Sequence, residues 1–552
     1  MPTLEWIGKE KVINHDKEVP FRILEPKYTY DSEGKHKGVA TSDNMIIHGD
    51  NLLALKALLP KYRGKIKCIY IDPPYNTGKE GWIYNDNVND PQIKKWLGEV
   101  VGKEGDDLSR HDKWLCMMYP RLKILQELLS EDGIIFISID DNEQANLKLI
   151  CDEIFGARNL FGQLIWKSDG NFDNQAKVKV CHEYIISYMK NIIISGLPNG
   201  YDPTTPSNSK IFKTEIRNTV VKNGSKNPMS EIVLPKGFPS AIKDNIIKAR
   251  NNAYPIYYED AEIENYALKK DTIVKSGWAS KDQLEEFIKS GFNSVEDSKG
   301  QTTRFEITAS GTIEIVKTRN RISHVMSILS GLGSTQSMSQ ALSRINIDFD
   351  FPKPTQLIEY LAGFYTEQNE IVLDAFAGSG TTAHAVLNMN KQDGGNRKFI
   401  LVELGDYAET VTAERVRRVI NGYGEGKNAV DGTGGSFTFY ELGPQLFADN
   451  GNLNAKVGTD RIREYIWFTE TQKPLADNDG DNKAFLGVAN GCAYYFHYDK
   501  DATTTLDHEF MATIKTKADS YVIYADVCSL DDDFLSKHHI TFKKIPRDIA
   551  RI

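Results

Sequence analysis

Short apolar runs alternate with amphipathic segments in two regions of the chain, before residue 160 and after residue 345. The runs expected to form strands are 45–48, 66–71, 134–139, 370–374 and 398–403. The segments with helical spacing are 52–59, 114–129, 142–155, a stretch that ends near 390, and 408–423. Strands that alternate with helices in this way are typical of an α/β fold with a largely parallel sheet covered on both faces.

The region from about 160 to 345 follows a different pattern. Short strands are expected near Trp166, at 182–188 and at 192–194, and Pro-, Asn- and Ser-rich stretches follow over 198–239. The polar segment 331–339 is expected to be flexible. We interpret this region as a domain inserted between the two α/β halves, with loops that can follow a ligand surface.

Two polar stretches and the end of the chain complete the predicted organisation. Residues 79–112 predict a long mobile loop, and the Gly-, Asn- and Asp-rich residues 422–435 predict a linker. The apolar strands 485–488 and 521–525 predict a small C-terminal α/β domain. The predicted division is 1–160, 161–345, 346–425 and 426–552, in which the first and third segments are two halves of one domain.

Composition narrows the class of protein. The chain has 552 residues, too many for one hydrophobic core, with 40% hydrophobic and 26% charged residues. It has no signal-peptide pattern and no apolar run long enough to span a bilayer. Its six cysteines form no CxxC pair, so we expect reduced thiols in a cytoplasmic protein. No spacing of ligands predicts a metal site.

The net charge of −9 argues against a basic protein that coats nucleic acid. Nine Lys and Arg residues nevertheless lie between residues 201 and 250. A basic stretch in an acidic chain indicates phosphate contacts, and the alternative is a solvated loop region.

The most informative segment is Asp72-Pro73-Pro74-Tyr75, directly after the apolar run 66–71. An acid at the carboxyl end of a strand lies where open α/β sheets bind ligands. Asp72 or a neighbouring carbonyl can accept hydrogen bonds from an exocyclic amino group. The prolines fix φ and remove N–H groups, and the Tyr75 ring can stack on a base. The segment therefore predicts a pocket for a flat substrate that carries an amino group.

A second turn follows the strand 370–374 and reads Asp374-Ala375-Phe376-Ala377-Gly378-Ser379-Gly380-Thr381-Thr382. Gly378 and Gly380 allow a tight turn and a close approach of a ligand to the backbone. Glu403 ends the next strand, at the distance expected for a ribose-binding acid. Because GxGxxG is absent, the pattern favours an adenosine without a pyrophosphate.

Asp50 also follows a predicted strand, 45–48. Asp50, Asp72 and Glu403 are therefore expected at one edge of the sheet. The alternative for Asp50 is a simple helix cap.

The two turns resemble motifs of the amino-group DNA methyltransferases that use S-adenosylmethionine. Asp72-Pro-Pro-Tyr75 resembles their catalytic DPPY motif, and residues 374–382 resemble their cofactor motif, usually DPFxGSGTT, with Ala375 in place of proline. The order of catalytic motif, recognition domain and cofactor motif is similar to the β group, a circular permutation of the Rossmann-like methyltransferase sheet. Phe351-Pro-Lys-Pro354 and Gly49-Asp-Asn-Leu52 resemble segments that accompany these motifs. Nearly the whole chain resembles the modification (Mod) subunit of Type III restriction-modification systems.

This resemblance implies roles for particular residues. Asp72, Pro73, Pro74 and Tyr75 would be catalytic and would hold adenine, flipped out of duplex DNA, for methylation at N6. Lys353 would lie near the methionine carboxylate of the cofactor and Glu403 at its ribose. The implied cofactor-binding residues are Asp374, Phe376, Gly378, Gly380, Thr381, Glu403, Asp50 and Lys353. The segment 161–345 would be the target-recognition domain, and the implied partners are double-stranded DNA, a restriction (Res) nuclease/helicase subunit and a second copy of the chain.

Three alternatives stay open from the sequence. The first is cytosine N4 methylation, which identification of the modified base would separate from adenine N6 methylation. The second is a DNA-recognition subunit whose main task is to direct a nuclease partner. The third is an RNA or small-molecule methyltransferase, which the basic stretch disfavours.

Overall fold

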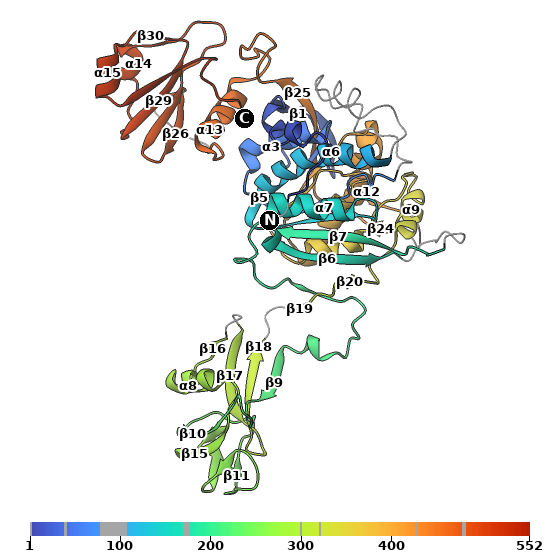
Figure 1. The fold of residues 1–552 in the computed structure, drawn as a ribbon, viewed down its shortest axis with the longest axis vertical. Coiled ribbons are helices and arrows are strands. Elements are labelled where there is room, and N and C mark those ends of the chain that lie inside the picture. Colours follow the sequence, from blue (N-terminus) through green and yellow to red (C-terminus); the bar gives the residue numbers. More distant parts are fainter. Residues whose placement is uncertain are drawn as a thin grey trace. The chain divides into compact units, whose positions relative to one another are not determined.

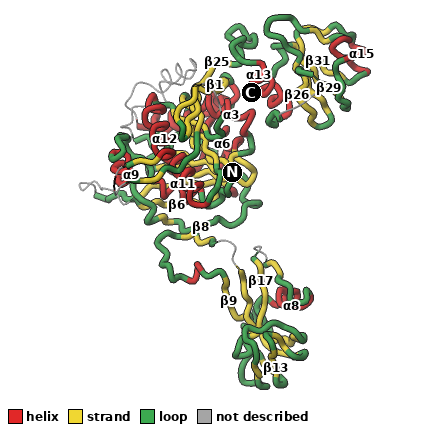
Figure 2. The backbone as a smooth tube through the Cα atoms, turned by 180° about the vertical axis from the view of Figure 1, so that it is seen from behind, coloured by secondary structure: helices red, strands yellow, loops and turns green. Residues whose placement is uncertain are grey.

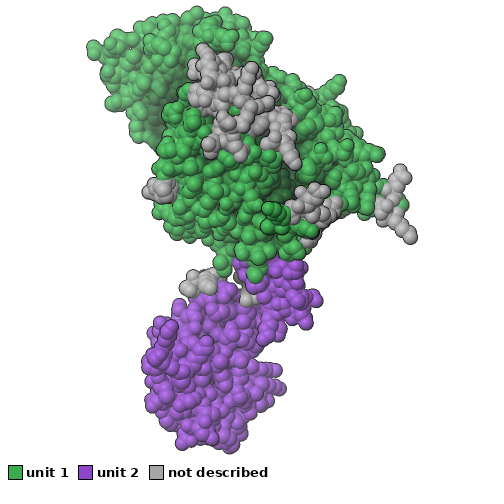
Figure 3. Space-filling view, turned by 45° about the vertical axis from the view of Figure 1, so that its right-hand side comes forward, with its two compact units in different colours: residues 1–198, 326–552 green, residues 199–325 purple. Residues whose placement is uncertain are grey.

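The computed structural model describes residues 3–37, 41–77, 107–168, 177–297, 301–318, 322–424, 426, 429–476 and 482–551 (Figure 1). The chain divides into two compact units, one of Met1–Pro198 with Met326–Ile552 and one of Asn199–Val325 (Figure 3). Most of the predicted loop 79–112 lies outside the described residues, and its end is helical because α6 begins at Asp107. In the described part of the chain, no helix is both long and apolar enough to cross a bilayer.

The first unit is built on an eleven-stranded sheet. In spatial order its strands are β2 (Gly34–Lys37), β1 (Arg22–Asp31), β25 (Phe437–Gln445), β3 (Met45–His48), β22 (Lys398–Glu403), β21 (Ile371–Asp374), β4 (Ile66–Ile71), β5 (Leu129–Ile139), β7 (His182–Met189), β6 (Leu160–Lys167) and β20 (Ile328–Leu329). The strands from β25 to β5 run parallel, and antiparallel pairs flank them on both sides. The predicted α/β class is confirmed, with a mixed sheet that is parallel at its centre and again at one edge, where β20 pairs in parallel with β6.

Helices pack on both faces of this sheet. In the described residues, the α-helices of the first unit before β25 are α1 (Lys9–Val12), α2 (His15–Glu18), α3 (Asn51–Tyr62), α6 (Asp107–Leu128), α7 (Gln144–Cys151), α9 (Thr335–Ser343), α10 (Thr355–Ala362), α11 (Thr381–Asp393) and α12 (Glu414–Asn421). Apolar residues of α3, α6 and α7 share one core with Ile69 and Ile135 (Figure 1). On the other face Phe364, just after α10, packs against Phe136, and α11 and α12 are seen from that side in Figure 2.

The strands 45–48, 66–71 and 398–403 begin and end where the sequence predicts, but two other expectations were wrong. Residues 192–194 form a turn in which Ile193 and Ile194 are exposed. The polar segment 331–339 leads into α9, since Ser334 and Ser337 form a capping box at its start. Among the described residues of the predicted linker 422–435, β23 (Gly422–Tyr423) and β24 (Val430–Asp431) form a hairpin.

The second unit, Asn199–Val325, is mostly β structure. Its strands are β8 (Gly200–Tyr201), β9 (Glu215–Thr219), β10 (Met229–Leu234), β11 (Asn245–Ile247), β12 (Ile256–Tyr257), β13 (Ala261–Glu264), β14 (Ala267–Leu268), β15 (Thr272–Gly277), β16 (Val295–Glu296), β17 (Thr302–Ile307), β18 (Ile313–Thr318) and β19 (Ser323–His324), with the helix α8 (Lys281–Lys289). They enclose a core that includes Leu234, Phe238 and Phe305. Near the ends of the unit, β8 pairs in parallel with β19.

The chain after β25 forms a smaller sheet in the first unit. Its elements are α13 (Thr459–Thr471), β26 (Phe485–Ala489), β27 (Cys492–Phe496), β28 (Thr505–Leu506), α14 (His508–Ala512), β29 (Ser520–Ala525), β30 (Val527–Cys528), α15 (Asp532–Lys537) and β31 (Ile540–Lys544). The order is β26-β27-β29-β31, with β27, β29 and β31 parallel. The predicted boundary at residue 425 is not tested and stays a prediction.

We predict that the fragment 199–325 folds by itself, because it has its own core and its two ends are paired. Phe305 is fully buried, and Phe305→Ala should lower the free energy of unfolding of the fragment by about 3–5 kcal/mol. Thermal unfolding followed by circular dichroism would test both points. A fragment that melts without a cooperative transition would contradict the first.

Candidate functional site

Four parallel strands bring the predicted site residues to one edge of the sheet. Glu403 lies opposite His48 in the pairing of β22 with β3, and Leu373 lies opposite Ile69 in the pairing of β21 with β4. The Gly49 N–H donates to the Glu403 carbonyl at 2.9 Å. The Asn51 side chain donates to the Ala375 carbonyl at 3.0 Å. The turns after β3, β4, β21 and β22 are therefore neighbours.

Buried side chains hold the backbone of the Asp72 turn in place. Trp114 of α6 is fully buried, and its indole N–H donates to the Pro74 carbonyl at 2.7 Å. Asn76 adopts a φ of 61°, and its side chain donates to the buried carboxylate of Glu143. Glu143 also bonds the His111 ring at 2.7 Å. These contacts fix the backbone of the turn while Asp72 and Tyr75 stay partly exposed.

Tyr75 and Lys353 both contact the Asp72 carboxylate, and both also contact the carboxylate of Glu183. The Tyr75 hydroxyl lies 2.9 Å from Asp72 Oδ1 and 2.7 Å from Glu183 Oε2. The Lys353 ammonium donates to Asp72 Oδ2 at 2.7 Å and lies 3.3 Å from Glu183 Oε2. Burial alone would lower the pKa of Lys353, but the Asp72 and Glu183 carboxylates outweigh it and raise the pKa to about 12. Lys353 is therefore a cation when it contacts this turn.

Burial also raises the pKa of the Tyr75 hydroxyl well above its ordinary value, and the Asp72 and Glu183 carboxylates add to the effect. Tyr75 is thus a neutral phenol whose single hydrogen is available to a carboxylate. Its ring lies under the Lys353 ammonium, 5.1 Å from the ring centroid.

Sequence reasoning missed Glu183. It stands at the start of β7, which runs antiparallel to β5, with Tyr184 opposite Ile139. The first residues of β7 therefore lie at the edge where β5 ends. The acid in His182-Glu183-Tyr184 could have been assigned to the site only if the antiparallel direction of β7 had been known.

The second turn wraps around Glu403. The Gly378 N–H donates to Glu403 Oε2 at 2.7 Å, and the Gly405 N–H donates to Oε1 at 2.8 Å. Gly378 and Gly380 have φ values of 51° and 81°, which L side chains rarely adopt. A Cβ on Gly378 would also lie 3.2 Å from the Phe349 ring. The loop thus requires glycine for its own conformation.

Asp374 is buried beneath this loop. Its carboxylate accepts from the Phe376 N–H at 3.0 Å and from the Thr382 hydroxyl at 2.5 Å. Burial raises the pKa of Asp374 to about 7, against the effect of these two hydrogen bonds. Burial likewise raises the pKa of Glu403. In this structure Asp374 shapes the loop, and Phe376 is nearly buried.

Asp50 caps the N-terminus of α3, which is the helix-cap role that the sequence left open as the alternative to a ligand contact. Its side chain accepts from the Leu52 and Leu53 N–H groups at 2.9 and 3.1 Å. The second carboxylate oxygen lies 3.3 Å from the buried guanidinium of Arg121. A cap and a ligand contact are compatible because a carboxylate accepts several hydrogen bonds. The cofactor role of Asp50 stays a prediction.

Lys353 and Arg415 connect the second turn to the rest of the site. The Thr381 hydroxyl donates to the Lys353 carbonyl at 3.1 Å. The guanidinium of Arg415 is fully buried and donates to the hydroxyls of Ser379 and Thr381 at 2.7 and 2.8 Å. Burial lowers the pKa of Arg415 to about 9. No local pattern pointed to Arg415, which lies in a helix with ordinary charge spacing.

This arrangement can bind a flat ligand that donates hydrogen bonds at Asp72 and a second ligand at the glycine turn. The nearby acids favour a cation or an amine over an anion. Among the described residues, no group of three or more His, Cys, Asp or Glu side chains is placed to hold a metal ion.

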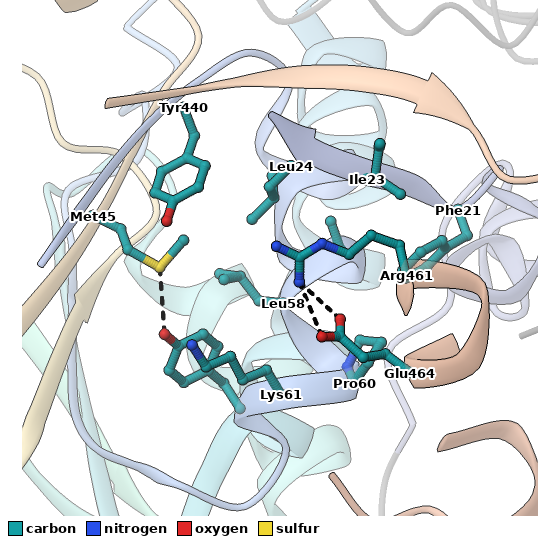
Figure 4. Close-up of a pocket in the computed structure, with 12 residues that line it drawn as sticks. Phe21, Ile23, Leu24, Met45, Leu58, Pro60, Lys61, Tyr440, Arg461 and Glu464 are labelled. Carbon is teal, nitrogen blue, oxygen red and sulfur yellow. Dashed lines mark hydrogen bonds and ion pairs between the residues drawn. The ribbon is translucent and has the colours of Figure 1, made fainter. Parts of the chain in front are cut away.

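A separate pocket lies at the other end of β3 and holds none of the predicted site residues (Figure 4). Met45, Leu58 and Tyr440 give it an apolar lining, and the Tyr62 hydroxyl contacts the Met45 sulfur at 3.4 Å. Arg461 and Glu464 of α13 form an ion pair at its rim.

Comparison with known proteins gives consistent matches. A family model described as DNA methylase matches residues 66–414. The chain is 33% identical to the EcoPI Mod subunit of Escherichia phage P1, a Type III restriction-modification enzyme, over 73% of this chain and 63% of that protein. It is 30% identical to the EcoP15I Mod subunit of Escherichia coli over 73% of this chain and 64% of that protein. The matches thus span less than two thirds of these two relatives.

Solved structures match more weakly. TTHA0409 of Thermus thermophilus, complexed with S-adenosyl-L-methionine, is 14% identical with a TM-score of 0.32. That match covers 72% of this chain and 99% of TTHA0409.

The buried Asp374 leads to a prediction about pH. Its pKa is higher in the folded protein than the ordinary value of 3.8, so the folded state binds the proton more tightly than the unfolded chain. The resulting stabilisation is fully present below the ordinary pKa and is lost as the pH rises through about 7. The loss for this one group should be on the order of 4 kcal/mol.

Asp374→Asn should remove this contribution, because the amide can keep a bond to the Thr382 hydroxyl and the Phe376 N–H without titrating. Urea unfolding of both proteins at about pH 4.5 and about pH 8 would measure the difference. If the difference in stability between them is the same at both pH values, the assigned pKa shift is wrong.

Proposed function

This chain belongs to the DNA methylase family, and on that premise we propose that it methylates adenine N6 in duplex DNA, using S-adenosylmethionine and base flipping. The observation that carries the proposal is the position of the Asp72 turn. A carboxylate, a carbonyl and an aromatic ring of this turn lie beside the glycine turn, whose Gly378 N–H donates to the proposed ribose-binding acid, Glu403. The permuted Rossmann-like arrangement belongs to this proposal and is supported by the strand order β3-β22-β21-β4-β5.

The second turn fits an adenosine cofactor without phosphates. Gly378 and Gly380 carry no Cβ, so a ligand can approach the backbone of the turn closely. Glu403 accepts from the Gly378 and Gly405 N–H groups and from the Tyr407 hydroxyl, and ribose hydroxyls would share its carboxylate with these donors. The residues that would hold the cofactor are Asp374, Phe376, Gly378, Gly380, Thr381, Glu403, Asp50 and Lys353. When bound, S-adenosylmethionine supplies a methyl group on a positively charged sulfur, which the surrounding acids favour.

The first turn fits the target base. The Asp72 carboxylate and the Pro73 carbonyl would accept hydrogen bonds from the amino group, which directs the nitrogen lone pair outward. Pro73 and Pro74 have no N–H that competes for these acceptors. The Tyr75 ring would stack on the base, an interaction worth about 1–3 kcal/mol in single-stranded contacts. Since Tyr75 is already held at its hydroxyl, the ring is oriented before the base arrives.

Adenine is preferred over cytosine in this proposal because the turn begins with Asp72, whereas relatives specific for cytosine N4 more often begin with serine. Cytosine N4 remains the second candidate, since both reactions need the same acceptors for an amino group. Acid hydrolysis of modified DNA and identification of the methylated base would decide between them.

The similarity to EcoPI and EcoP15I Mod subunits supports a place in a Type III restriction-modification system. We propose that 161–345 contains the target-recognition domain, to which the compact unit Asn199–Val325 contributes its basic stretch. The proposed partners are duplex DNA, a Res nuclease/helicase subunit and a second copy of the chain. We propose that the protein works in the cytoplasm, in keeping with its scattered cysteines.

The function is tested by expressing the chain in a host without DNA methylation and sequencing the genomic DNA by a single-molecule method. We expect N6-methyladenine at one short sequence motif. Asp72→Ala should abolish the signal because it removes the main acceptor for the amino group, while the cofactor affinity stays unchanged. Full methylation by Asp72→Ala would refute the mechanism.

Gly378→Leu tests the cofactor site. A side chain at this φ of 51° is strained, and it would collide with the Phe349 ring. The dissociation constant for S-adenosylmethionine, measured by calorimetry, should rise at least about a hundredfold, which corresponds to about 2.7 kcal/mol. Gly394→Leu is a control, because Gly394 also has a positive φ but no atom of a described residue lies within 4 Å of the position that a Cβ would take there. Equal cofactor affinities for the two variants would contradict the assigned pocket.

A further inference from the structure

The side chains around Asp72 form a closed ring of four groups. Asp72 Oδ1 contacts the Tyr75 hydroxyl at 2.9 Å, and this hydroxyl contacts Glu183 Oε2 at 2.7 Å. Glu183 Oε2 lies 3.3 Å from the Lys353 ammonium, which donates to Asp72 Oδ2 at 2.7 Å. Both oxygens of the proposed acceptor for the target base are therefore engaged before any base is bound.

A target amino group must replace at least one of these donors on Asp72. Lys353 is only 7% exposed, so an ammonium released from Asp72 needs another anion beside it. A buried charge without a partner is expensive, and the exchange would then be strongly opposed. The ring contains a second carboxylate that avoids this cost.

Glu183 already contacts both donors through a single oxygen. The phenol of Tyr75 has one hydrogen, so it can bond only one of the two carboxylates at a time. When that hydrogen and the ammonium turn to Glu183, the Asp72 oxygens become free to accept from a new donor. The ring carries two carboxylates and one ammonium, so its surplus negative charge also favours a ligand that donates hydrogen bonds.

We propose that Glu183 is a positioning residue that holds Lys353 and Tyr75 while Asp72 changes partners to the amino group of the target base. The inference rests on the proposed function and adds a residue that acts through Asp72. The alternative is that these contacts are merely structural and only hold β7 against the turn after β4. The two roles differ in what they predict for recognition of the amino group.

The test compares binding of two DNA duplexes that contain the methylation site found by sequencing. One duplex has adenine at the target position, and the other has purine, which lacks the amino group. S-adenosylhomocysteine is present so that no methyl transfer occurs. We expect the wild-type protein to bind the adenine duplex about ten- to a hundredfold more tightly, as for a hydrogen bond to a charged acceptor.

Glu183→Gln should lose most of this preference, because Lys353 and Tyr75 then remain on Asp72. The rate of single-turnover methylation should fall by a similar factor. The dissociation constant for S-adenosylhomocysteine should stay within about twofold, since the change is on the side of the base. Glutamine has the size of glutamate, so the fold should be kept, and thermal unfolding of the variant checks this.

Tyr75→Phe provides the matched variant. It removes the same Tyr75–Glu183 hydrogen bond but leaves Glu183 to hold Lys353. Tyr75 is itself part of the proposed base site, so the comparison is one of degree: the preference for adenine over purine should fall less in Tyr75→Phe than in Glu183→Gln, whereas a merely structural contact predicts the same loss in both variants. Glu441→Gln, which changes a carboxylate bonded to His48 on the same sheet, controls for the loss of a charge.

Two outcomes separate this inference from the function on which it rests. If the wild-type protein methylates DNA and Glu183→Gln keeps both the rate and the adenine preference, the role of Glu183 is refuted and the proposed function stands. If the wild-type protein methylates no DNA, the proposed function fails and the inference fails with it.

Discussion

Parallel pairing of β4 with β21 joins segments from distant parts of the chain, with Cys68 beside Val372 and Ile69 beside Leu373. Because both strands point the same way, the turn after each one lies at the same edge of the sheet. Asp72 and Asp374 are the first residue beyond β4 and the last residue of β21. A slip of one residue in this register would turn the side chains to the opposite face and separate the two turns.

Much of the fold and both turns could be predicted from the sequence, because local apolar runs decide where buried strands begin and end. The strands β3, β4 and β22 follow such runs closely. Glu183 and Arg415 could not be found in this way, since each reaches the site through strand order or helix packing that no local pattern records. The helix α9 was missed for a related reason, because the serines that suggested a loop serve as its cap. Roles at the cofactor and the base depend on ligands and remain proposals.

The site gathers several carboxylates at one edge, and each has its own donors. Asp50 is satisfied by the first turn of α3 and by Arg121, and Glu403 by two glycine N–H groups. Asp374 relies on a hydroxyl and a backbone N–H, whereas Asp72 shares an ammonium with Glu183. Buried acids without such partners would be protonated or would destabilise the fold. Asp72 and Glu183 accept from the side chains of Tyr75 and Lys353, which can move. Asp50, Asp374 and Glu403 each accept at least one hydrogen bond from a backbone N–H group, whose position is fixed by the fold.

The pairing of β8 with β19 has a consequence for how the chain reaches this structure. Joining β4 to β21 closes a very long loop, and the entropy lost on closure grows with loop length. Asn199–Val325 lies within that loop, and once β8 and β19 have paired, its two ends are adjacent. For the entropy of loop closure, the folded segment then acts as a short connection instead of a long flexible chain. Early folding of this unit would therefore shorten the search that assembles the large sheet.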